Sequence, residues 1–581
     1  MGYSEFFPGE KQIDIFATLR LYSRTKLVRM AAILSLHYGN MSIPDDNKTL
    51  FSEISEKHGP YLNKLFKAYY KRLGLSQKEQ VVILTYRTSL ELWRQIFAIR
   101  TDEFTDQVEA CDAELLLFKV ILTLNEKLLK FNERDDLYKF DELLFLNGFL
   151  TNDNNSYDLK TVLQSQIYYF QQLVSFIPSS KVLSMAWEKL LADWGVESWL
   201  HYFATIVYLA KETDKYINAG ESGLPVISPD LLRGNSDANL LSISLIENLC
   251  IEEDEYIPCT VDPHSSHQLN IDYRRFRSKP FVKLKDGSGY VVINNQILCE
   301  RLFNSLYFDF MPLINGKNGS CGFFNYNKDF IEKVLFRKTF FNCIRPHHYT
   351  YPNRKGDTSA ETLHEPDFYI RTKQGELVLV ECKAIKMNGE SRDDGDYVRL
   401  LDELKEKIVL KTRNLDKNRK EHKGKPEPIG IGQLIHHINS IEDDHFEWDS
   451  YLPNEVIYYP ILVFEDIKLT QTGVLPIVNR WFYEAIEAQG ILNLKETACM
   501  PVMVVSINTL YLYDEILRRK GLTNLIDSFV EDNAIYDSTT GRYNLNPTAD
   551  FDAYLRRNPY NKSKDMQRWM REMRIGFNLN P

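Results

Sequence analysis

The stretch EPDFYIRTKQGELVLVECKAIK, residues 365–386, decides how we expect this chain to fold. Its segment LVLV at 377–380 is continuously apolar, which is typical of a strand that is buried on both faces of a sheet. Successive side chains of a strand point to opposite faces, so Glu381 and Lys383 share one face and Cys382 lies on the other. The stretch therefore predicts a central strand that ends in charged residues.

A second strand precedes this one and is predicted to pair with it. If Asp367 stands opposite Glu381 in an antiparallel pair, Arg371 faces Leu377, and the connection between the strands contains Gly375, as in an ordinary hairpin. Two carboxylates in this register lie about 5 Å apart between their Cβ atoms. The hairpin is thus expected to bring two acids together on one face.

Like charges placed opposite each other destabilise a sheet, so this pair needs a cation between its members. Oxygen ligands of this kind suit Mg²⁺ or Mn²⁺, which bind through one or two carboxylates and phosphate oxygens. Lys383 lies on the same face, where its ammonium group can contact an attacking water or stabilise charge on a phosphate.

Pro366-Asp367 followed by Glu381-Cys382-Lys383 resembles the motif of the PD-(D/E)xK nuclease superfamily. The resemblance implies a restriction-endonuclease-like α/β core with a mixed sheet. It also implies that Asp367, Glu381 and the backbone carbonyl of Cys382 hold one or two Mg²⁺ or Mn²⁺ ions, while Lys383 orients the water that attacks a phosphodiester. The alternative interpretation is a structural hairpin whose charged residues are solvated at the end of a strand.

Two further residues match the superfamily in order and type. Glu332 lies in a predicted helix at 327–341, and members often carry a helical acid there that reaches the metal. Gln433, in a helix that begins near 430, resembles the Gln of a Gln-x-x-x-Tyr element beside the metal site. Here His437 stands where the Tyr would be, which leaves the second half of that element in doubt. The alternative for both is an ordinary helix-face residue.

The length of 581 residues exceeds what one hydrophobic core supports, so several domains are expected. Apolar residues recur at helical spacing through 1–255, which predicts a large all-α region for regulation or oligomerisation. We expect a connector at 256–315 with a β-hairpin and a helix, a nuclease core at 316–510, and a helical C-terminal extension with a basic tail at 511–581.

Within the expected core, strand structure is predicted at 342–349 and a polar loop facing the substrate at 351–365. After the central hairpin, apolar runs predict strands at 458–464 and 500–506, with a helix at 478–489 between them. This order of helices and strands is that of the α/β core which the resemblance implies.

The formal net charge of −10 argues against a protein that coats nucleic acid along its whole surface. Two basic stretches, 411–425 and 556–574, are candidates for local phosphate contacts, with solvated segments as the alternative. No apolar run approaches the roughly 18 residues of a membrane helix, and the N-terminus lacks a signal-peptide core, so we expect a cytoplasmic protein with no membrane partner. The chain contains no phosphate-binding loop of the G-x-x-x-x-G-K-[ST] kind.

The resemblance as a whole implies a Mg²⁺-dependent endonuclease that acts on DNA and is similar to bacterial restriction or anti-phage defence enzymes. A double-strand break needs two such sites, so we expect a homodimer or larger assembly, and a separate ATPase or sensor protein is a further candidate partner. The alternatives are a nuclease acting on RNA, and an inert nucleic-acid-binding or assembly protein that keeps the fold.

Overall fold

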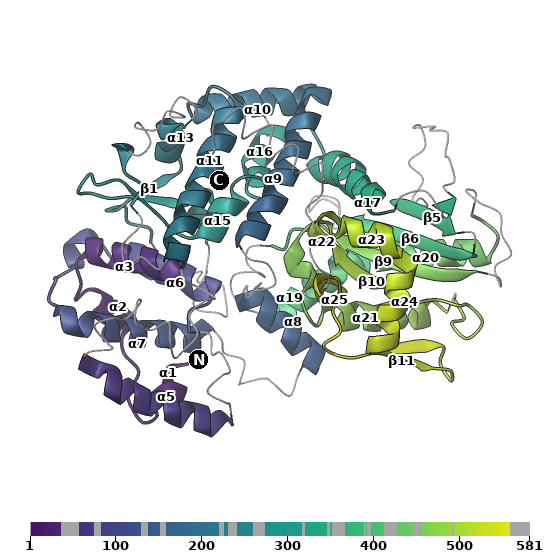
Figure 1. Ribbon diagram of the computed structural model, residues 1–581, viewed down its shortest axis with the longest axis horizontal. Helices are drawn as coiled ribbons and strands as arrows, with labels where there is room; N and C mark the ends of the chain where they lie inside the picture. The colour runs from purple at the N-terminus through teal and green to yellow at the C-terminus, as the bar shows by residue number, and fades with distance from the viewer. Residues whose placement is uncertain are drawn as a thin grey trace, which may run out of the picture.

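The computed structural model describes residues 2–36, 57–74, 83–128, 138–151, 159–219, 226–230, 241–258, 273–315, 320–344, 349–350, 366–372, 374–388, 391, 397–411, 427–446, 456–490 and 492–557. Two bodies of structure stand out: helices with a small sheet in one, and a larger sheet covered by helices in the other (Figure 1). The protein is thus a mostly helical, multidomain α/β protein.

The N-terminal part is built from helices, as the sequence predicts. Most are amphipathic and bury one side, whereas α6 is buried along its whole length. The helices are α1 Tyr3–Phe6, α2 Ile15–Leu19, α3 Arg24–Leu36, α5 Gly59–Leu73, α6 Tyr86–Phe97, α7 Ala110–Leu128, α8 Phe140–Thr151, α9 Leu159–Phe176, α10 Lys181–Asp193, α11 Trp199–Ala219 and α13 Ile243–Asn248.

A small sheet follows these helices. Strand β1 (Cys250–Glu252) pairs in parallel with β2 (Phe281–Lys283), and β2 pairs with β3 (Tyr290–Val292) in the predicted antiparallel hairpin. We expected residues 1–255 to be all-α. Strand β1 lies within this range, so the region also contains β structure. The connector continues with α14 Arg274–Ser278, α15 Asn295–Glu300 and α16 Leu306–Ile314.

The hydrophobic packing divides the molecule at other places than 255 and 315. One core joins α1–α7 to the small sheet. The other, larger core extends from α8 to the last described helix and contains the larger sheet. Helix α9 contacts the C-terminal part directly, since the ring of Tyr168 stacks on that of Tyr511 with centroids 4.0 Å apart. The helical half therefore contributes to both cores.

The larger sheet is mixed, and the strands that the structure describes have the order β10-β9-β6-β5-β4. The antiparallel part consists of β4 (Tyr349–Thr350), β5 (Phe368–Thr372) and β6 (Glu376–Lys383). Strand β9 (Ile457–Phe464) runs parallel to β6, and β10 (Met503–Ser506) runs parallel to β9. In the register of β5 with β6, Arg371 faces Leu377, which confirms the predicted hairpin.

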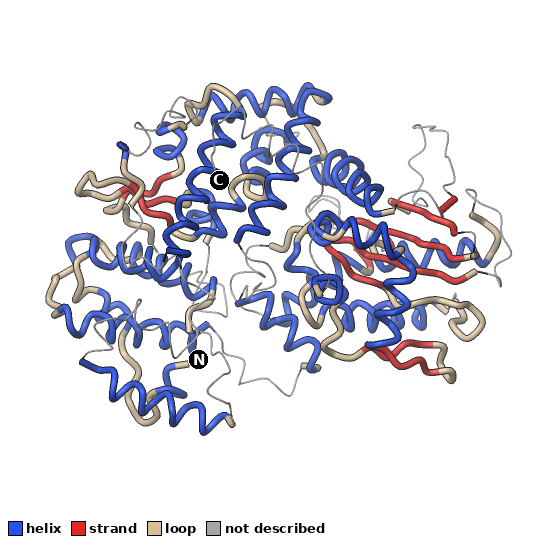
Figure 2. Tube along the Cα trace, viewed as in Figure 1, coloured by secondary structure: helices blue, strands red, loops and turns tan. Residues whose placement is uncertain are grey.

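Helices cover both faces of this sheet (Figure 2). One face carries α20 (Ile431–Glu442), since the Tyr458 hydroxyl of β9 donates to Glu442 over 2.5 Å. The other face carries α24 (Leu522–Asn533), where Tyr459 donates to Asp527 over 2.9 Å. Strand β6 lies between β5 and β9 and is therefore buried on both faces, as its apolar run predicts.

The remaining elements surround the sheet (Figure 1). They are the π-helix η7 Tyr326–Phe336 and the α-helices α17 Arg337–Cys343, α19 Tyr397–Ile408, α21 Val474–Gln489, α22 Ile507–Leu512, α23 Asp514–Lys520 and α25 Phe551–Arg556, with the short antiparallel strands β7 Leu410–Lys411, β8 Glu427–Pro428, β11 Ala534–Asp537 and β12 Arg542–Leu545. Among the helices of the described residues, none is both long and apolar enough to cross a membrane.

Two predictions are wrong in part. The strand expected at 342–349 does not begin at 342, because helix α17 continues to Cys343; Tyr349 belongs to β4, and 345–348 lie outside the described residues. The C-terminal extension is not wholly helical, because β11 and β12 form a hairpin within it. The predicted loop at 351–365, nearly all of the basic stretch 411–425 and most of 556–574 lie outside the described residues.

Candidate active site

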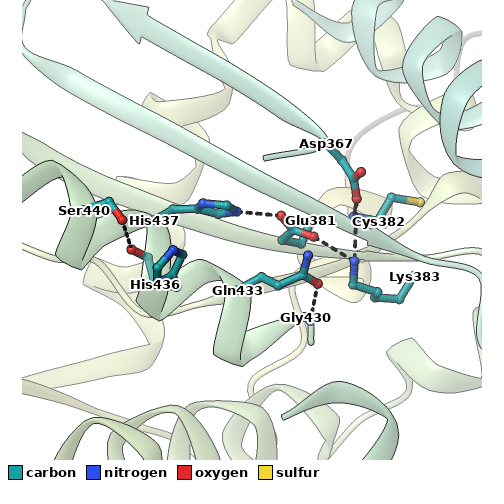
Figure 3. Close-up of polar contacts among 9 residues, drawn as sticks. All are labelled: Asp367, Glu381, Cys382, Lys383, Gly430, Gln433, His436, His437 and Ser440. Atoms are coloured by element: carbon teal, nitrogen blue, oxygen red, sulfur yellow. Dashed lines mark hydrogen bonds and ion pairs between the residues drawn. The ribbon is translucent and has the colours of Figure 1, made fainter. Parts of the chain in front are cut away.

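Asp367, Glu381 and Lys383 converge on one face of the β5–β6 hairpin (Figure 3). The register that pairs Phe368 with Val380 places Asp367, one residue earlier, opposite Glu381. The Lys383 ammonium nitrogen lies 2.7 Å from Glu381 Oε2 and 3.7 Å from Asp367 Oδ2. A positive charge therefore occupies the space between two carboxylates, as the like-charge pairing requires.

Cys382 contributes to this arrangement through its backbone. Its N–H donates to Asp367 Oδ2 over 2.7 Å, which fixes the Asp367 carboxylate against β6. Its thiol is fully buried, and the alternation of the strand points it away from Glu381 and Lys383. The role of its carbonyl as a metal ligand remains a prediction.

Helix α20 holds Glu381 from the opposite side. His437 Nε2 lies 2.9 Å from Glu381 Oε1, and both side chains are only 1% exposed. The two oxygens of Glu381 are thus divided, one toward His437 and the other toward Lys383 (Figure 3). In the sequence, His437 is only a departure from the Gln-x-x-x-Tyr pattern, which indicates no role for it.

Glu332 reaches the same region from η7. Burial raises the pKa of Glu332, while the Lys383 charge lowers it and the Glu381 charge raises it further. The neighbouring Asn327 side chain donates to the carbonyl of Ala384, directly after β6, over 3.0 Å. The predicted helical acid is therefore held beside the end of the strand that carries Glu381 and Lys383.

Gln433 has a structural contact of its own. Its Oε1 accepts a hydrogen bond of 2.9 Å from the backbone N–H of Gly430, which caps the N-terminus of α20 (Figure 3). This contact accounts for a glutamine at that position, and its role beside a metal remains a prediction.

Burial and neighbouring charges shift the pKa values of the site residues in opposite directions. Burial would lower the pKa of Lys383, but the carboxylates of Glu381, Asp367 and Glu332 outweigh it and the pKa is raised. Burial would raise the pKa of Glu381, but Lys383 and the hydrogen bond from His437 lower it. Burial, followed by the Glu381 charge, raises the pKa of Asp367 to about 7. Of the two acids on the hairpin, the one farther from the Lys383 ammonium, Asp367, is thus the one whose ionised form is disfavoured.

The residues present fit a divalent cation. The carboxylates of Asp367 and Glu381 share one ammonium group, that of Lys383, and the charge of Glu332 also acts on this lysine. All the donors are hard oxygens, which suit Mg²⁺ or Mn²⁺. Within the part of the chain that the structure describes, no three His, Cys, Asp or Glu side chains form a ready cluster around one ion.

A second ion pair, with a buried carboxylate, lies close to the site, and no sequence motif indicates it. Lys386, three residues after Lys383, pairs with Glu465, the residue that follows β9, and the Glu465 side chain is 3% exposed. The Lys386 ammonium also lies 5.7 Å from the centre of the Tyr307 ring. The Glu465 N–H reaches the Lys383 carbonyl over 3.4 Å, so this pair fixes the chain directly beyond the site.

Comparison with models of known protein families, with curated proteins and with solved structures found no match to this chain.

Proposed function

We propose that this protein is a metal-dependent nuclease which hydrolyses phosphodiester bonds, with DNA as the substrate. The observation that supports this most directly is the convergence of Asp367 and Glu381 on Lys383 at the end of a central hairpin. Two acids and one lysine in this register make up the site that the PD-(D/E)xK motif implies.

Each residue of the site would have a separate role in hydrolysis. Asp367 and Glu381 would hold Mg²⁺ or Mn²⁺, which when bound lowers the pKa of a coordinated water and neutralises phosphate charge. Lys383 holds the two carboxylates together and places a cation beside the position of a scissile phosphate. The Cys382 N–H keeps Asp367 turned toward this position.

The direct test is cleavage of plasmid DNA, single-stranded DNA and RNA by the purified full-length chain, with Mg²⁺ or Mn²⁺ and with chelator. We expect cleavage of DNA that requires the metal and is lost in Glu381→Ala. Cleavage of RNA but not of DNA would mean that RNA is the substrate. Binding of nucleic acid without any cleavage would favour an inert protein that keeps the fold.

A defence role, a homodimer and a partner ATPase or sensor remain parts of the proposal. The full chain would make a double-strand break through two copies of this site, since one site cuts one strand. Linearisation of plasmid with a second-order dependence on protein concentration, alongside the mass of the protein in solution, tests the assembly.

A further inference from the structure

The hydrogen bond between His437 and Glu381 is placed so that it can hold the Glu381 carboxylate in one orientation. His437 extends from α20 to the end of β6, across the interface between a helix and the sheet, and its Nε2 lies 2.9 Å from Glu381 Oε1. Both side chains are almost fully buried. A buried hydrogen bond to a charged acceptor is among the stronger contacts in a protein, so it restricts the Glu381 rotamer.

The surroundings of His437 also fix which ring nitrogen carries the proton. Its Nδ1 is buried and has no hydrogen-bond partner among the described residues. A proton on Nδ1 would be a buried donor without an acceptor, which is costly. The Glu381 carboxylate only accepts, so the His437 ring donates to it from Nε2.

The bond holds the Glu381 carboxylate so that its two oxygens point to different partners. Oε1 is turned to His437, whereas Oε2 faces the Lys383 ammonium at 2.7 Å. Asp367 Oδ2 faces the same ammonium at 3.7 Å, so the two oxygens turned to one cation come from different carboxylates. Mg²⁺ accepts single carboxylate oxygens in an octahedral shell, while Ca²⁺ often takes both oxygens of a glutamate.

We infer that His437 is a positioning residue which keeps Glu381 a one-oxygen ligand and so makes the site select Mg²⁺ or Mn²⁺ over Ca²⁺. The inference rests on the proposed function, because it needs a divalent cation at Asp367 and Glu381. A histidine that only fills space in the core would leave the ratio of Mg²⁺ to Ca²⁺ affinity unchanged.

Three substitutions distinguish a histidine that positions Glu381 from one that only fills space in the core. His437→Gln keeps an N–H donor near the position of Nε2, whereas His437→Leu keeps much of the volume and removes the donor. His437→Asn carries the same amide as the Gln variant on a side chain one methylene shorter, which falls short of Glu381. His436→Gln is the matched control on the same helix. Titration calorimetry with Mg²⁺, Mn²⁺ and Ca²⁺ gives the affinities, and the thermal midpoint reports folding.

We expect His437→Leu to lose roughly 10- to 100-fold in Mg²⁺ affinity, the usual effect of removing a partner of a metal ligand, with a smaller loss for Ca²⁺. His437→Gln and the His436 control should keep the wild-type ratio. If the Leu variant does not fold, the Asn variant should show the changed ratio instead.

A folded Leu or Asn variant with the wild-type ratio of Mg²⁺ to Ca²⁺ affinity would overturn the inference alone. Wild-type protein that binds metal and cleaves DNA would in that case leave the proposed function standing. Wild-type protein that binds no divalent cation would overturn both.

Discussion

Lys383 supplies the positive charge that Asp367 and Glu381 share. It is 11% exposed and lies between Glu381 and Asp367. Removing one member of a buried ion pair costs about 3–5 kcal/mol, because a charge is left without a partner. We expect Lys383→Met to abolish cleavage and to lower the thermal midpoint in chelator, and we expect Mg²⁺ to raise that midpoint more than it does for the wild type.

Lys386→Met is the matched control for this substitution. It removes a half-buried ammonium group nearby, which pairs with Glu465 rather than with the two site carboxylates. Its stability should also fall, but metal-dependent cleavage should survive and Mg²⁺ should restore no stability beyond the wild-type effect. Equal behaviour of the two variants in Mg²⁺ would argue against a special role of Lys383.

Asp367→Asn should show the opposite effect on stability. The pKa of Asp367 is raised to about 7 by burial and then by Glu381, so its ionised form is disfavoured in the folded protein without metal. An amide keeps an oxygen for the Cys382 N–H and removes the repulsion. In chelator at pH 8 the variant should therefore be at least as stable as the wild type while lacking metal binding and cleavage. Loss of stability in chelator would show that Asp367 serves the fold instead.

At this scale the sequence predicts the site well where strand geometry determines it. The alternation of side chains and the length of the loop place Asp367 opposite Glu381, and the observed pairing of Arg371 with Leu377 has that register. His437 could not be assigned, because helical spacing puts it on the face of Gln433 without showing which strand meets that face.

Among the elements, α20 is positioned by the residue that precedes it. Gly430 has a φ of 52°, and a Cβ there would lie 2.7 Å from the backbone oxygen of Ile408. Gly490 has a similar φ of 63° but open space around it. Gly430→Ala should therefore lower the free energy of unfolding by about 1–3 kcal/mol more than Gly490→Ala does, because a backbone segment must move as well.

The same substitution should also reduce cleavage, since α20 carries the bond to Glu381. Urea unfolding of both alanine variants, followed by circular dichroism, gives the stability difference. Equal losses of unfolding free energy in the two variants would mean that the backbone at Ile408 moves at little cost and does not hold α20 in place.

Helix α25 carries a buried acid whose ionisation opposes folding. Burial, followed by the Asp550 charge, raises the pKa of Asp552 from 3.8 to about 6. Between these values the folded protein holds a proton that the unfolded chain has lost, so stability falls as the pH rises through this window. An asparagine can still accept the hydrogen bonds from Thr470 and Ser506, of 2.8 and 3.2 Å, without the charge.

Asp552→Asn should therefore be more stable than the wild type at pH 8, by about 1–3 kcal/mol, and should lose this advantage below about pH 4. Thermal midpoints of the two proteins measured across this range test the sign. An advantage that stays constant with pH would show that packing rather than charge determines the difference.

Individual helices and strands were predictable where the pattern of apolar residues was continuous or regular. The apolar run at 377–380 gives a buried strand, and the amphipathic run after 430 gives α20. The error at 342–343 has a physical cause, because these residues end a helix whose last residue, Cys343, is buried against the carbonyl of Leu510. A contact with a residue so distant in sequence overrides local preference.

For the whole molecule, the sequence indicates several domains but does not show which surfaces pack together. Composition and length indicate several domains, but the domain limits at 255, 315 and 510 rest on where the local pattern changes. Packing is decided by surfaces that meet in three dimensions. Arg480 of α21, for instance, binds Asp141 of α8 over 2.6 Å, which joins the predicted nuclease core to the predicted regulatory region.

The larger core extends beyond 316–510 at both ends, so this range should not fold alone. Residues 316–510 contain the candidate site but lack α9, whose Tyr168 donates or accepts a 3.0 Å bond with Thr339, and α24, whose Asp527 binds Tyr459. Domains are stable by only about 5–15 kcal/mol, so exposing these faces should leave the fragment unfolded. The fragment 138–557 keeps every buried member of the larger core and should unfold cooperatively. Near-UV circular dichroism and thermal melts of both fragments beside the full chain measure this, and a cooperative melt of 316–510 alone would restore the narrower domain.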